Sequence, residues 1–456
     1  MSDLFDDEGR RQAADAVYAT LLERLGEASI RPRLAPTRRA VEILGDPQRA
    51  YPVIQIAGTN GKTSTSRMIE SLLRAHGLRV GLFTSPHLER FNERIVIDGE
   101  PISDEGLVAN WQDVEPYIRM TDAELAEQGE APLSFFEAIT VLAYAAFADA
   151  PIDVAVVEVG MGGEWDSTNV ADAQVAVFTP IALDHMNRLG STIEEIARTK
   201  SGIVKPLASV VSAKQTPEAE AVLRDAASIT ESTIVFEGAE FDISSTTVAV
   251  GGQLVSVRGL AASYEQLLLP FFGDHQAENA AVAVAAVETF LGGGTQQLTG
   301  GVLDEGFAGA TSPGRLQLVG LAPRTVVDAA HNPHGAASLA AALGRYFDFD
   351  RVTAVVGVLA EKDAEGILRA LLPVVDELIV TTAPSDRALP ADELAALART
   401  VFPAEAVHVA EDPLGALTAG RVIAARTDKG ALIVTGSITL VGRTITVARD
   451  ENWLGA

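Results

Sequence analysis

The sequence predicts an α/β fold of two domains, and three observations support this prediction. The chain has 456 residues with 47% hydrophobic content, which is longer than one hydrophobic core usually supports. From Tyr51 onward, short β-branched apolar runs alternate with segments of helical period, as expected for a parallel sheet covered by helices. Between about Thr233 and Val257 the pattern changes to alternation around Gly251-Gly252, which favours a hairpin in a small antiparallel side sheet.

The first half of the chain supplies the strands of the main sheet. We expect strands at Val53–Ala57, Arg79–Thr84, Ile152–Val159 and Val175–Thr179. The last two are continuous apolar runs, which suit central strands buried on both faces. A helix is expected from about Thr63, with its apolar face built from Met68, Ile69, Leu72 and Leu73 and its C-terminal stop at Gly77.

The second half predicts a smaller α/β domain. An alanine-rich helix from Ala277 to Phe290 is followed by three glycines, and a further helical stretch leads to Ser312-Pro313-Gly314. Four more strands are expected, at Thr325–Ala329, Val352–Val358, Glu377–Thr381 and Ala431–Val434. We therefore predict one domain over residues 1–310 and a second over residues 311–456.

The composition narrows the function classes. The chain carries 35 basic and 62 acidic residues, and its net charge of -27 repels nucleic acid and anionic membranes. The absence of cysteine excludes disulfides, thiolate metal sites and a cysteine nucleophile. The acidic stretch Met1–Arg11 lacks the pattern of a signal peptide, and no apolar run approaches a membrane span, so a cytoplasmic location is expected. An anionic nucleotide would need local compensation by Mg²⁺, lysine and backbone N–H groups.

The segment from Gly58 to Thr63, with the sequence GTNGKT, lies between a predicted strand and a predicted helix. Backbone N–H groups and the helix dipole can hold phosphates at such a position, and Lys62 can neutralise them. The first glycine of the common nucleotide loop would fall at Ile56, so the segment matches a shorter form. The alternative interpretation is a glycine-rich turn with an incidental lysine.

Three further loops follow predicted strands, and they carry Ser85, Glu158 and His185. Ligand sites in open α/β sheets lie at the carboxyl ends of the strands, so these side chains are expected to converge on the phosphate loop. A hydroxyl, a carboxylate and an imidazole make a plausible site for a hard cation, although imidazole is a less usual ligand for Mg²⁺. Taken singly, each also has a structural interpretation as a turn former, a strand-end charge or a loop histidine.

Twelve motifs occur in a specific order between about residues 38 and 443. They are GTNGKT at Gly58, TSPHL at Thr84, RFNERI at Arg90, FFE at Phe135, EVGMGG at Glu158, DSTN at Asp166, DH at Asp184, KSGIVK at Lys200, GDHQAEN at Gly273, SPGRL at Ser312, DAAHNPHG at Asp328 and GSITLVG at Gly436. Through these motifs and their order, the chain resembles the folylpolyglutamate synthase and dihydrofolate synthase branch of the Mur ligase family. The resemblance implies a P-loop NTPase-like central domain and a Rossmann-like C-terminal domain.

The resemblance also implies the residues of the ATP and metal sites. Mg²⁺ would be bound by Ser85, Glu158 and His185, and a second Mg²⁺ by a carbamate formed on Lys200. The alternative for Lys200 is a solvated helix lysine. The implied ATP-binding residues are Gly58, Thr59, Asn60, Gly61, Lys62, Thr63, Ser64, Gln276, Asn279, Arg315, Asp328 and His331. The implied catalytic set is Lys62, Lys200, His331, Asp166 and Ser437.

For the folate end, the resemblance points to His87, Leu88, Arg90, Phe135 and Phe136. Aromatic and apolar surfaces of this kind can stack against a flat heterocycle. The two phenylalanines also begin an apolar helix, and a pair of core residues would give the same sequence.

Two positions depart from the pattern of many family members. Glu164 stands where arginine is frequent, which indicates a possible change of specificity. Asn187 stands where aspartate is common after the DH pair, which leaves the hydrogen bonding of His185 open.

The implied activity is the ATP- and Mg²⁺-dependent ligation of L-glutamate to dihydropteroate and to the γ-carboxylate of reduced folates. The reaction would proceed through an acyl phosphate, with ATP bridging the two domains of a monomer. The alternatives are folylpolyglutamate synthase activity alone, a cell-wall ligase of the Mur type, and a nucleotide-binding regulatory protein without turnover.

Overall fold

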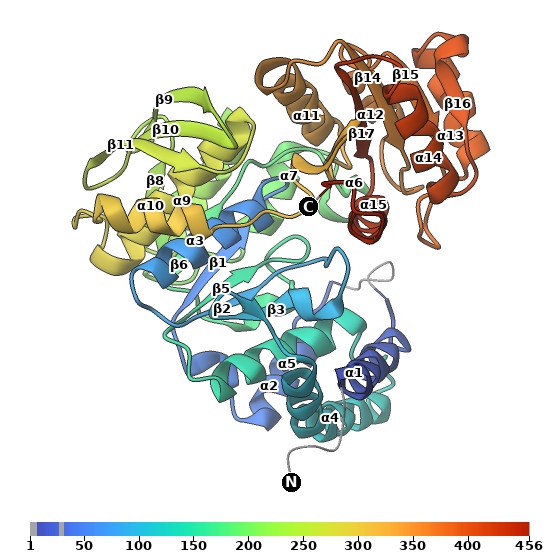
Figure 1. The fold of residues 1–456 in the computed structure, drawn as a ribbon. Helices are drawn as coiled ribbons and strands as arrows, with labels where there is room; N and C mark the ends of the chain where they lie inside the picture. Colours follow the sequence, from blue (N-terminus) through green and yellow to red (C-terminus); the bar gives the residue numbers. More distant parts are fainter. Residues whose placement is uncertain (1–6, 27–31, 456) are drawn as a thin grey trace. The chain divides into compact units, whose positions relative to one another are not determined.

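A computed structural model describes residues 7–26 and 32–455, and it divides the chain into two compact units (Figure 1). Unit 1 contains residues 1–245, 255–268 and 278–310, and unit 2 contains residues 246–254, 269–277 and 311–456. The first six residues of the acidic stretch Met1–Arg11 lie outside the described residues.

The main sheet of unit 1 has eight strands, and its centre is parallel. In spatial order the strands are β4 (Glu100–Pro101), β3 (Ile95–Ile97), β2 (Val80–Phe83), β5 (Val154–Glu158), β1 (Val53–Ala57), β6 (Val175–Phe178), β7 (Ser209–Ser212) and β8 (Thr233–Phe236). Every residue of β1, β5 and β6 is buried, as their uninterrupted apolar runs predict. All four strands predicted for the first half are therefore confirmed.

The helices of unit 1 pack on this sheet or on one another. They are α1 (Asp7–Leu22), α2 (Ala35–Leu44), α3 (Lys62–Ala75), α4 (Asp104–Glu127), α5 (Phe135–Asp149), α6 (Met186–Leu189), α7 (Ile193–Ser201), α8 (Pro217–Ile229) and α10 (Gly300–Gly309). The helix α3 packs against β2 and β5, and its predicted apolar face is fully buried. The helix ends at Ala75, and Gly77 has the left-handed φ of 82° expected of a C-terminal stop.

The side sheet has three strands in the order β11-β10-β9. They are β9 (Asp242–Ala249), β10 (Gly252–Arg258) and β11 (Ser263–Leu269), and the turn between β9 and β10 contains Gly251, as predicted. The prediction was wrong for Thr233–Phe236, which pairs in parallel with β7 in the main sheet. The pattern misled because β8 is an edge strand with partial exposure, so it lacks the continuous apolar run of a buried parallel strand and resembles an antiparallel one.

Unit 2 is built on a six-stranded sheet with the order β12-β13-β17-β14-β15-β16. The strands are β12 (Gln317–Leu321), β13 (Arg324–Val327), β14 (Arg351–Val356), β15 (Glu377–Val380), β16 (Val407–Val409) and β17 (Gly430–Thr435). The four predicted strands are confirmed, whereas β12, which is antiparallel to β13, and the short β16 were not predicted. The helices are α11 (Pro333–Tyr346), α12 (Ala364–Leu371), α13 (Ala391–Val401), α14 (Pro413–Ala424) and α15 (Ile438–Asp450).

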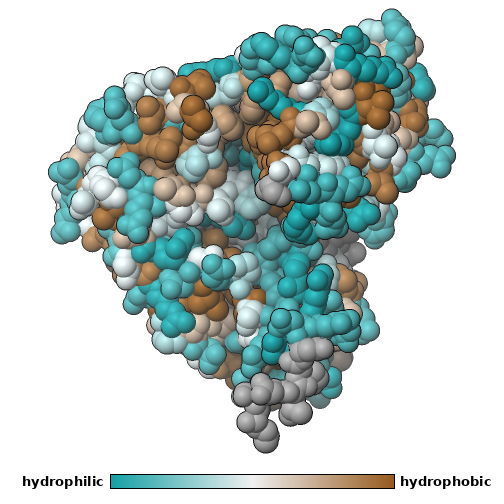
Figure 2. Space-filling model, viewed as in Figure 1, coloured by the Kyte–Doolittle hydropathy of each residue, from teal (hydrophilic) through white to brown (hydrophobic). Residues whose placement is uncertain are grey.

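The long alanine-rich helix α9 (Asp274–Gly292) matches the prediction of a helix over Ala277–Phe290. Its first four residues belong to unit 2 and the rest to unit 1. In the described part of the chain, no helix combines the length and apolar character that a membrane crossing needs. The face seen in Figure 2 mixes hydrophilic and hydrophobic residues.

Candidate active site

The phosphate loop connects β1 to the N-terminus of α3, as predicted. Gly58 has a φ of 152°, and a Cβ atom there would lie 1.9 Å from the Thr179 hydroxyl oxygen. Gly61 has a φ of 88°, and its Cβ atom would lie 2.5 Å from the side-chain oxygen of Asn279. Both positions therefore require glycine on conformational and steric grounds. The second contact also brings the α9 residue Asn279 to the loop, where the resemblance places it.

Two lysine side chains converge on one carbonyl of this loop. Lys62 Nζ donates to Gly58 O at 3.2 Å and to Thr59 O at 3.3 Å. Lys200 Nζ donates to the same Gly58 O at 2.8 Å. The Lys62 ammonium and the loop N–H groups supply local positive charge of the kind that an acidic chain needs in order to bind a nucleotide.

Lys200 is only 5% exposed, so its interpretation as a solvated helix lysine is wrong. Burial and, to a smaller extent, the nearby charge of Lys62 lower the pKa of Lys200 to about 7. Asp184 and Asp166 oppose this shift of the pKa. A large fraction of the Lys200 amine is therefore neutral near pH 7, and the neutral amine is the form that reacts with CO₂.

Glu158, at the end of β5, forms the centre of the predicted metal site. Its carboxylate is 2% exposed and accepts hydrogen bonds from the Thr63 hydroxyl at 2.9 and 3.0 Å. The backbone N–H of Ser85 lies 3.4 Å from the same carboxylate. A buried carboxylate beside two hydroxyl-bearing residues, at a phosphate loop, fits Mg²⁺, because Mg²⁺ at nucleotide sites uses one or two carboxylates with phosphate oxygens and water.

His185 stands at the N-terminus of α6 with a left-handed φ of 50°. Its Nε2 atom lies 3.8 Å from a carboxylate oxygen of Asp184, the residue whose charge acts on Lys200. Asn187, which stands where many family members have aspartate, has an exposed side chain, and Asp184 is an acidic neighbour of the imidazole.

Within residues 7–26 and 32–455, no group of three or more His, Asp or Glu side chains forms a metal site by itself. The predicted set contains one carboxylate and one imidazole, and it needs the Ser85 hydroxyl and a carbamate on Lys200 to complete it. The proposed site therefore depends on modification of Lys200 and on substrate oxygens.

Asp166 organises the loop after β5. Its carboxylate is 3% exposed, accepts from the Met161 N–H at 2.8 Å, and accepts from both the N–H and the hydroxyl of Thr168. The Gln55 amide from β1 donates to that hydroxyl at 3.0 Å. Burial raises the pKa of Asp166. These bonds give Asp166 a structural role in the loop after β5. In the sequence, the signal for this network was Gln55, the single polar side chain in the apolar β1 run.

The same loop fixes the end of α7, which carries Lys200. The Asn169 amide donates to Glu164 O and Gly202 O, each at 3.0 Å, and the Glu164 N–H donates to Thr199 O at 2.8 Å. The backbone of Glu164 makes these contacts while its side chain is exposed. Glu164, which stands where arginine is frequent in the family, therefore leaves the placement of Lys200 unchanged.

The predicted folate residues fall into two environments. Phe135 is 4% exposed and lies in the core, where its ring contacts Tyr18 and Phe91. Phe136 is half-buried beside Gly160, where an added Cβ would lie 2.5 Å from its ring. For Phe135 the geometry matches the core interpretation, and Phe136 is the more accessible of the pair.

His87 is held as a neutral ring. Arg94 Nε donates to its Nδ1 at 2.8 Å, and Tyr18 packs edge-on against it at 5.5 Å between ring centroids. Burial and, to a smaller extent, the Arg94 charge lower the pKa of His87 to about 3. His87 therefore presents an uncharged surface at physiological pH.

Leu88 and Arg90 belong to a turn organised by Glu93. The Glu93 carboxylate accepts from the N–H groups of Leu88 and Arg90, both at 2.8 Å. The Arg90 guanidinium forms an ion pair with Asp104 at 2.7 Å. Arg90 thus has a structural partner at the N-terminus of α4.

In unit 2, the loops after β13 and β17 lie together. Asp328 is 6% exposed, and its two carboxylate oxygens accept from the N–H groups of Leu316 at 2.9 Å and Ala330 at 2.8 Å. Ala330 O in turn accepts from the Gly436 N–H at 3.0 Å. Asp328 thereby ties the turn that carries Arg315 to the end of β13.

The other predicted residues of unit 2 lie in these loops or at the start of α9. His331 Nδ1 lies 3.0 Å from Ala329 O. Ser437 is 1% exposed and caps α15, where its hydroxyl accepts from the Thr439 N–H at 3.3 Å. Gln276 is 1% exposed in the first turn of α9.

The remaining residues of the phosphate loop differ in exposure. Thr59 and Ser64 are buried, whereas Asn60 is partly exposed. The Thr59 side chain bonds to Ala182 in the loop after β6, a contact that no sequence pattern predicted.

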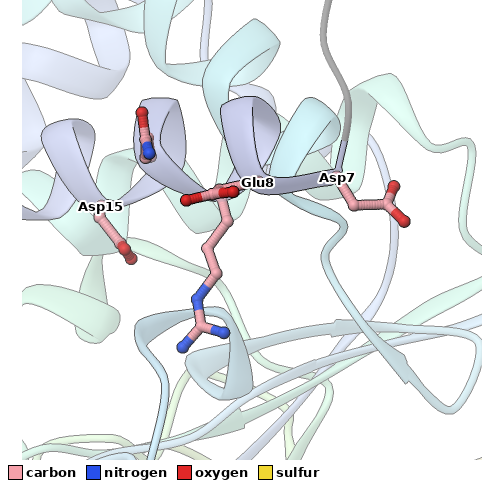
Figure 3. Close-up of a pocket in the computed structure, with 5 residues that line it drawn as sticks. Asp7, Glu8 and Asp15 are labelled. Atoms are coloured by element: carbon pink, nitrogen blue, oxygen red, sulfur yellow. The ribbon is translucent and has the colours of Figure 1, made fainter.

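A separate depression of about 480 Å³ lies along α1. It is lined by Asp7, Glu8, Arg11, Gln12 and Asp15. Figure 3 shows the labelled acidic side chains projecting from this one helix. None of the predicted site residues lines it, and an acidic helix surface offers no second element to enclose a ligand.

Comparison with known proteins defines the family. Residues 56–287 match the Mur ligase middle domain, and residues 314–438 match the Mur ligase glutamate ligase domain. The dihydrofolate synthase/folylpolyglutamate synthase of Mycobacterium tuberculosis is 43% identical over 441 residues, which cover 92% of this chain and 91% of the relative. This chain belongs to the Mur ligase family. Within that family it belongs to the dihydrofolate synthase/folylpolyglutamate synthase branch, as the ordered motifs predicted.

Solved structures of this Mur ligase branch agree with the fold. Folylpolyglutamate synthase of Mycobacterium tuberculosis complexed with ADP has a TM-score of 0.92 and 42% identity, covering 96% of this chain and 99% of that one. Escherichia coli FolC in complex with DHPP and ADP has a TM-score of 0.84 and 30% identity, covering 96% and 98%. These comparisons confirm the predicted Mur ligase architecture.

Proposed function

We propose that this protein ligates L-glutamate to dihydropteroate and to the γ-carboxylate of reduced folates, with ATP as the co-substrate. The single observation that carries the proposal is the convergence of Lys62 and Lys200 on Gly58 O, beside the buried Glu158 carboxylate. This arrangement suits phosphoryl transfer, which depends mainly on positioning and charge neutralisation. Membership of the folate branch supports the choice of substrates.

The reaction separates a difficult condensation into two steps. An acceptor carboxylate oxygen attacks the γ-phosphorus of ATP, and ADP leaves, which produces an acyl phosphate. The glutamate amine then attacks the acyl carbon, and inorganic phosphate leaves with the original carboxylate oxygen. A protein nucleophile is not required, so the absence of cysteine is compatible with this chemistry.

In unit 1, we assign the nucleotide phosphates to the loop N–H groups and Lys62. The N-terminus of α3 favours negative charge at this position. Asn279 contacts the loop and fits the nucleotide side of the site. In unit 2, Arg315 and Gln276 are assigned to the nucleotide, while Asp328 and His331 are assigned to the ribose and glutamate region. Asp166 and Ser437 act through the loops that they hold.

Two Mg²⁺ ions are part of the proposal. Ser85, Glu158 and His185 would hold one ion, and a carbamate on Lys200 would hold the other. Bound Mg²⁺ would neutralise charge on the phosphate oxygens during transfer. The neutral Lys200 amine would attack CO₂ and release a proton, which converts a neutral amine into an anionic carbamate that can bind a metal.

The folate acceptor is assigned to the surface near His87, Leu88 and Phe136, with Phe135 behind it in the core. We propose an ATP-binding domain of the Mur ligase type with the folate site over residues 1–310, and a C-terminal glutamate-ligase domain over residues 311–456. A cytoplasmic monomer is proposed, and the net charge of -27 disfavours nucleic acid and anionic lipid partners.

The test offers purified protein ATP, Mg²⁺ and L-glutamate with dihydropteroate in one sample and tetrahydrofolate in another. Phosphate release and a mass gain of one glutamate residue are expected in both samples. A product from tetrahydrofolate alone would restrict the enzyme to folylpolyglutamate synthesis. Phosphate release from neither folate acceptor would contradict the proposal, and a UDP-linked muramyl substrate would then test the cell-wall alternative.

A further inference from the structure

The segment that follows β6 runs from Thr179 to His185, and it reaches both the phosphate loop and the proposed metal site. On one side it is bonded to Thr59. The Thr59 N–H donates to Pro180 O at 2.9 Å, and the Thr59 hydroxyl both donates to Ala182 O and accepts from the Ala182 N–H at 3.0 Å. The backbone groups of Pro180 and Ala182 are therefore held by Thr59 of the phosphate loop.

On the other side the segment is bonded to one side chain, that of Gln215. Its amide nitrogen donates to Thr179 O at 3.1 Å and to the Ser212 hydroxyl at 3.2 Å. Its amide oxygen accepts from the Ile181 N–H at 3.0 Å. The Thr179 carbonyl and the Ile181 N–H are thus held by a glutamine that lies beyond the end of β7.

Beyond the end of β7, the Gln215 side chain replaces the backbone hydrogen bonds of a paired strand. The last backbone hydrogen bond between β6 and β7 runs from the Ala213 N–H to Phe178 O, at 2.8 Å. Beyond it, the donor and acceptor of the Gln215 amide take the place of a neighbouring backbone. Because alternate backbone groups of an extended segment point in opposite directions, Thr59 and Gln215 can hold it from both sides at once.

We propose that Gln215 is a positioning residue for MgATP, since it fixes the 179–185 segment that orients the phosphate loop and carries His185. The segment also shapes the loop directly, because Gly58 has no room for a Cβ atom beside Thr179. Gln215 itself contacts neither the phosphates nor the metal in this role. The inference rests on the proposed function and adds a residue that sets the affinity for the nucleotide.

The test is calorimetric binding of MgADP to the full-length protein, which needs no turnover. Gln215→Leu removes both the donor and the acceptor and should weaken MgADP binding about tenfold, because two hydrogen bonds to the segment are lost. The KM for MgATP should rise by a similar factor, while kcat at saturation and the KM for the folate acceptor change less than twofold. Gln48→Leu is the matched control, since Gln48 is 3% exposed and bonds to Asp46.

Hydrogen exchange separates positioning from general destabilisation. In Gln215→Leu, the amides of Ile181 and Ala182 should exchange faster while those of the β1 core keep their protection. Gln215→Glu preserves the length and the acceptor for the Ile181 N–H but loses the donor, and it serves if the leucine variant does not fold. It should also weaken MgADP binding.

Unchanged MgADP affinity in a folded Gln215 variant would overturn the inference, as would equal weakening in Gln48→Leu. These results are distinct from failure of the proposed function. In that case wild-type protein would bind MgADP and release no phosphate with either folate acceptor.

Discussion

Lys200 combines burial with a bond to the phosphate loop, so its replacement tests the site directly. Lys200→Ala should lower kcat by roughly 100-fold or more, because a metal ligand and its charge are lost. The melting temperature should change little, since the wild-type amine is costly to bury when charged. Steady-state kinetics and thermal melting measure the two effects. Unchanged activity would remove Lys200 from the metal site.

The pKa of Lys200 predicts how its modification depends on pH. With a pKa of about 7 in the folded protein against 10.5 for a free lysine, the neutral amine predominates above pH 7 and the ammonium form below it. Protein equilibrated with ¹³C-bicarbonate should therefore show a carbamate NMR signal at pH 8 that declines at pH 6. The Lys200→Ala variant is the control. A signal of equal strength in that variant would assign the carbamate to another group.

The unfolded chain binds the Lys200 proton up to about pH 10.5, whereas the folded protein releases it near pH 7. The contribution of Lys200 to stability therefore rises with pH between these values and is lost as the pH falls through 7. Lys200→Met should flatten this part of the stability profile, measured by urea unfolding between pH 6 and 9. An unchanged slope would contradict the lowered pKa.

Glu158→Gln keeps the size of the side chain and an oxygen that accepts from Thr63, but removes the negative charge. The Mg²⁺ concentration for half-maximal turnover should rise roughly 10- to 100-fold, because affinity for a hard cation depends on that charge. A Mg²⁺ titration of activity measures it. Wild-type Mg²⁺ dependence would exclude Glu158 from the metal site.

At the residue scale, sequence patterns could identify groups whose chemistry is local. Lys62 and Glu158 stand beside recognisable turns, and the structure places both at the phosphate loop. The same patterns could not separate Phe135 from Phe136, because a phenylalanine in the core and one facing a ligand look alike in the sequence. Gln215 was missed for a different reason: a side chain that bonds to the backbone of a distant loop leaves no periodic signal.

At the element scale, the strand-to-helix turn depends on two glycines, and Gly61→Ala tests it. Gly61 and Gly77 have similar φ values of 88° and 82°, but only Gly61 has an atom within 4 Å of an added Cβ. Each alanine should cost about 1–2 kcal/mol of stability through the left-handed backbone. Only Gly61→Ala should also weaken MgADP binding, measured by calorimetry. Equal binding by both variants would contradict the close approach of Asn279.

The elements themselves were predictable where burial was uniform. The central strands β1, β5 and β6 are buried along their full length, and apolar runs marked each of them. The edge strand β8 was assigned to the wrong sheet, because partial exposure gave it a pattern shared by antiparallel strands. Sheet membership of such a strand depends on partners distant in sequence, which periodicity does not report.

At the scale of the whole molecule, the strongly acidic chain concentrates positive charge where phosphates are expected. The net charge is -27, yet the Lys62 ammonium and the N-terminus of α3 lie at the phosphate loop. The family comparison and this local electrostatics lead to the same conclusion, a ligase that activates a carboxylate with ATP. Each of the two units carries part of the predicted site residues. The ordered motifs along the chain include residues from both units.

The central claim is that the acceptor carboxylate is phosphorylated before glutamate attacks it. The most direct test uses dihydropteroate with ¹⁸O in its carboxylate, together with ATP, Mg²⁺ and L-glutamate, and determines the mass of the released phosphate. Our account predicts one ¹⁸O atom in each phosphate formed with product. Unlabelled phosphate alongside the ligated product would contradict an acyl-phosphate mechanism.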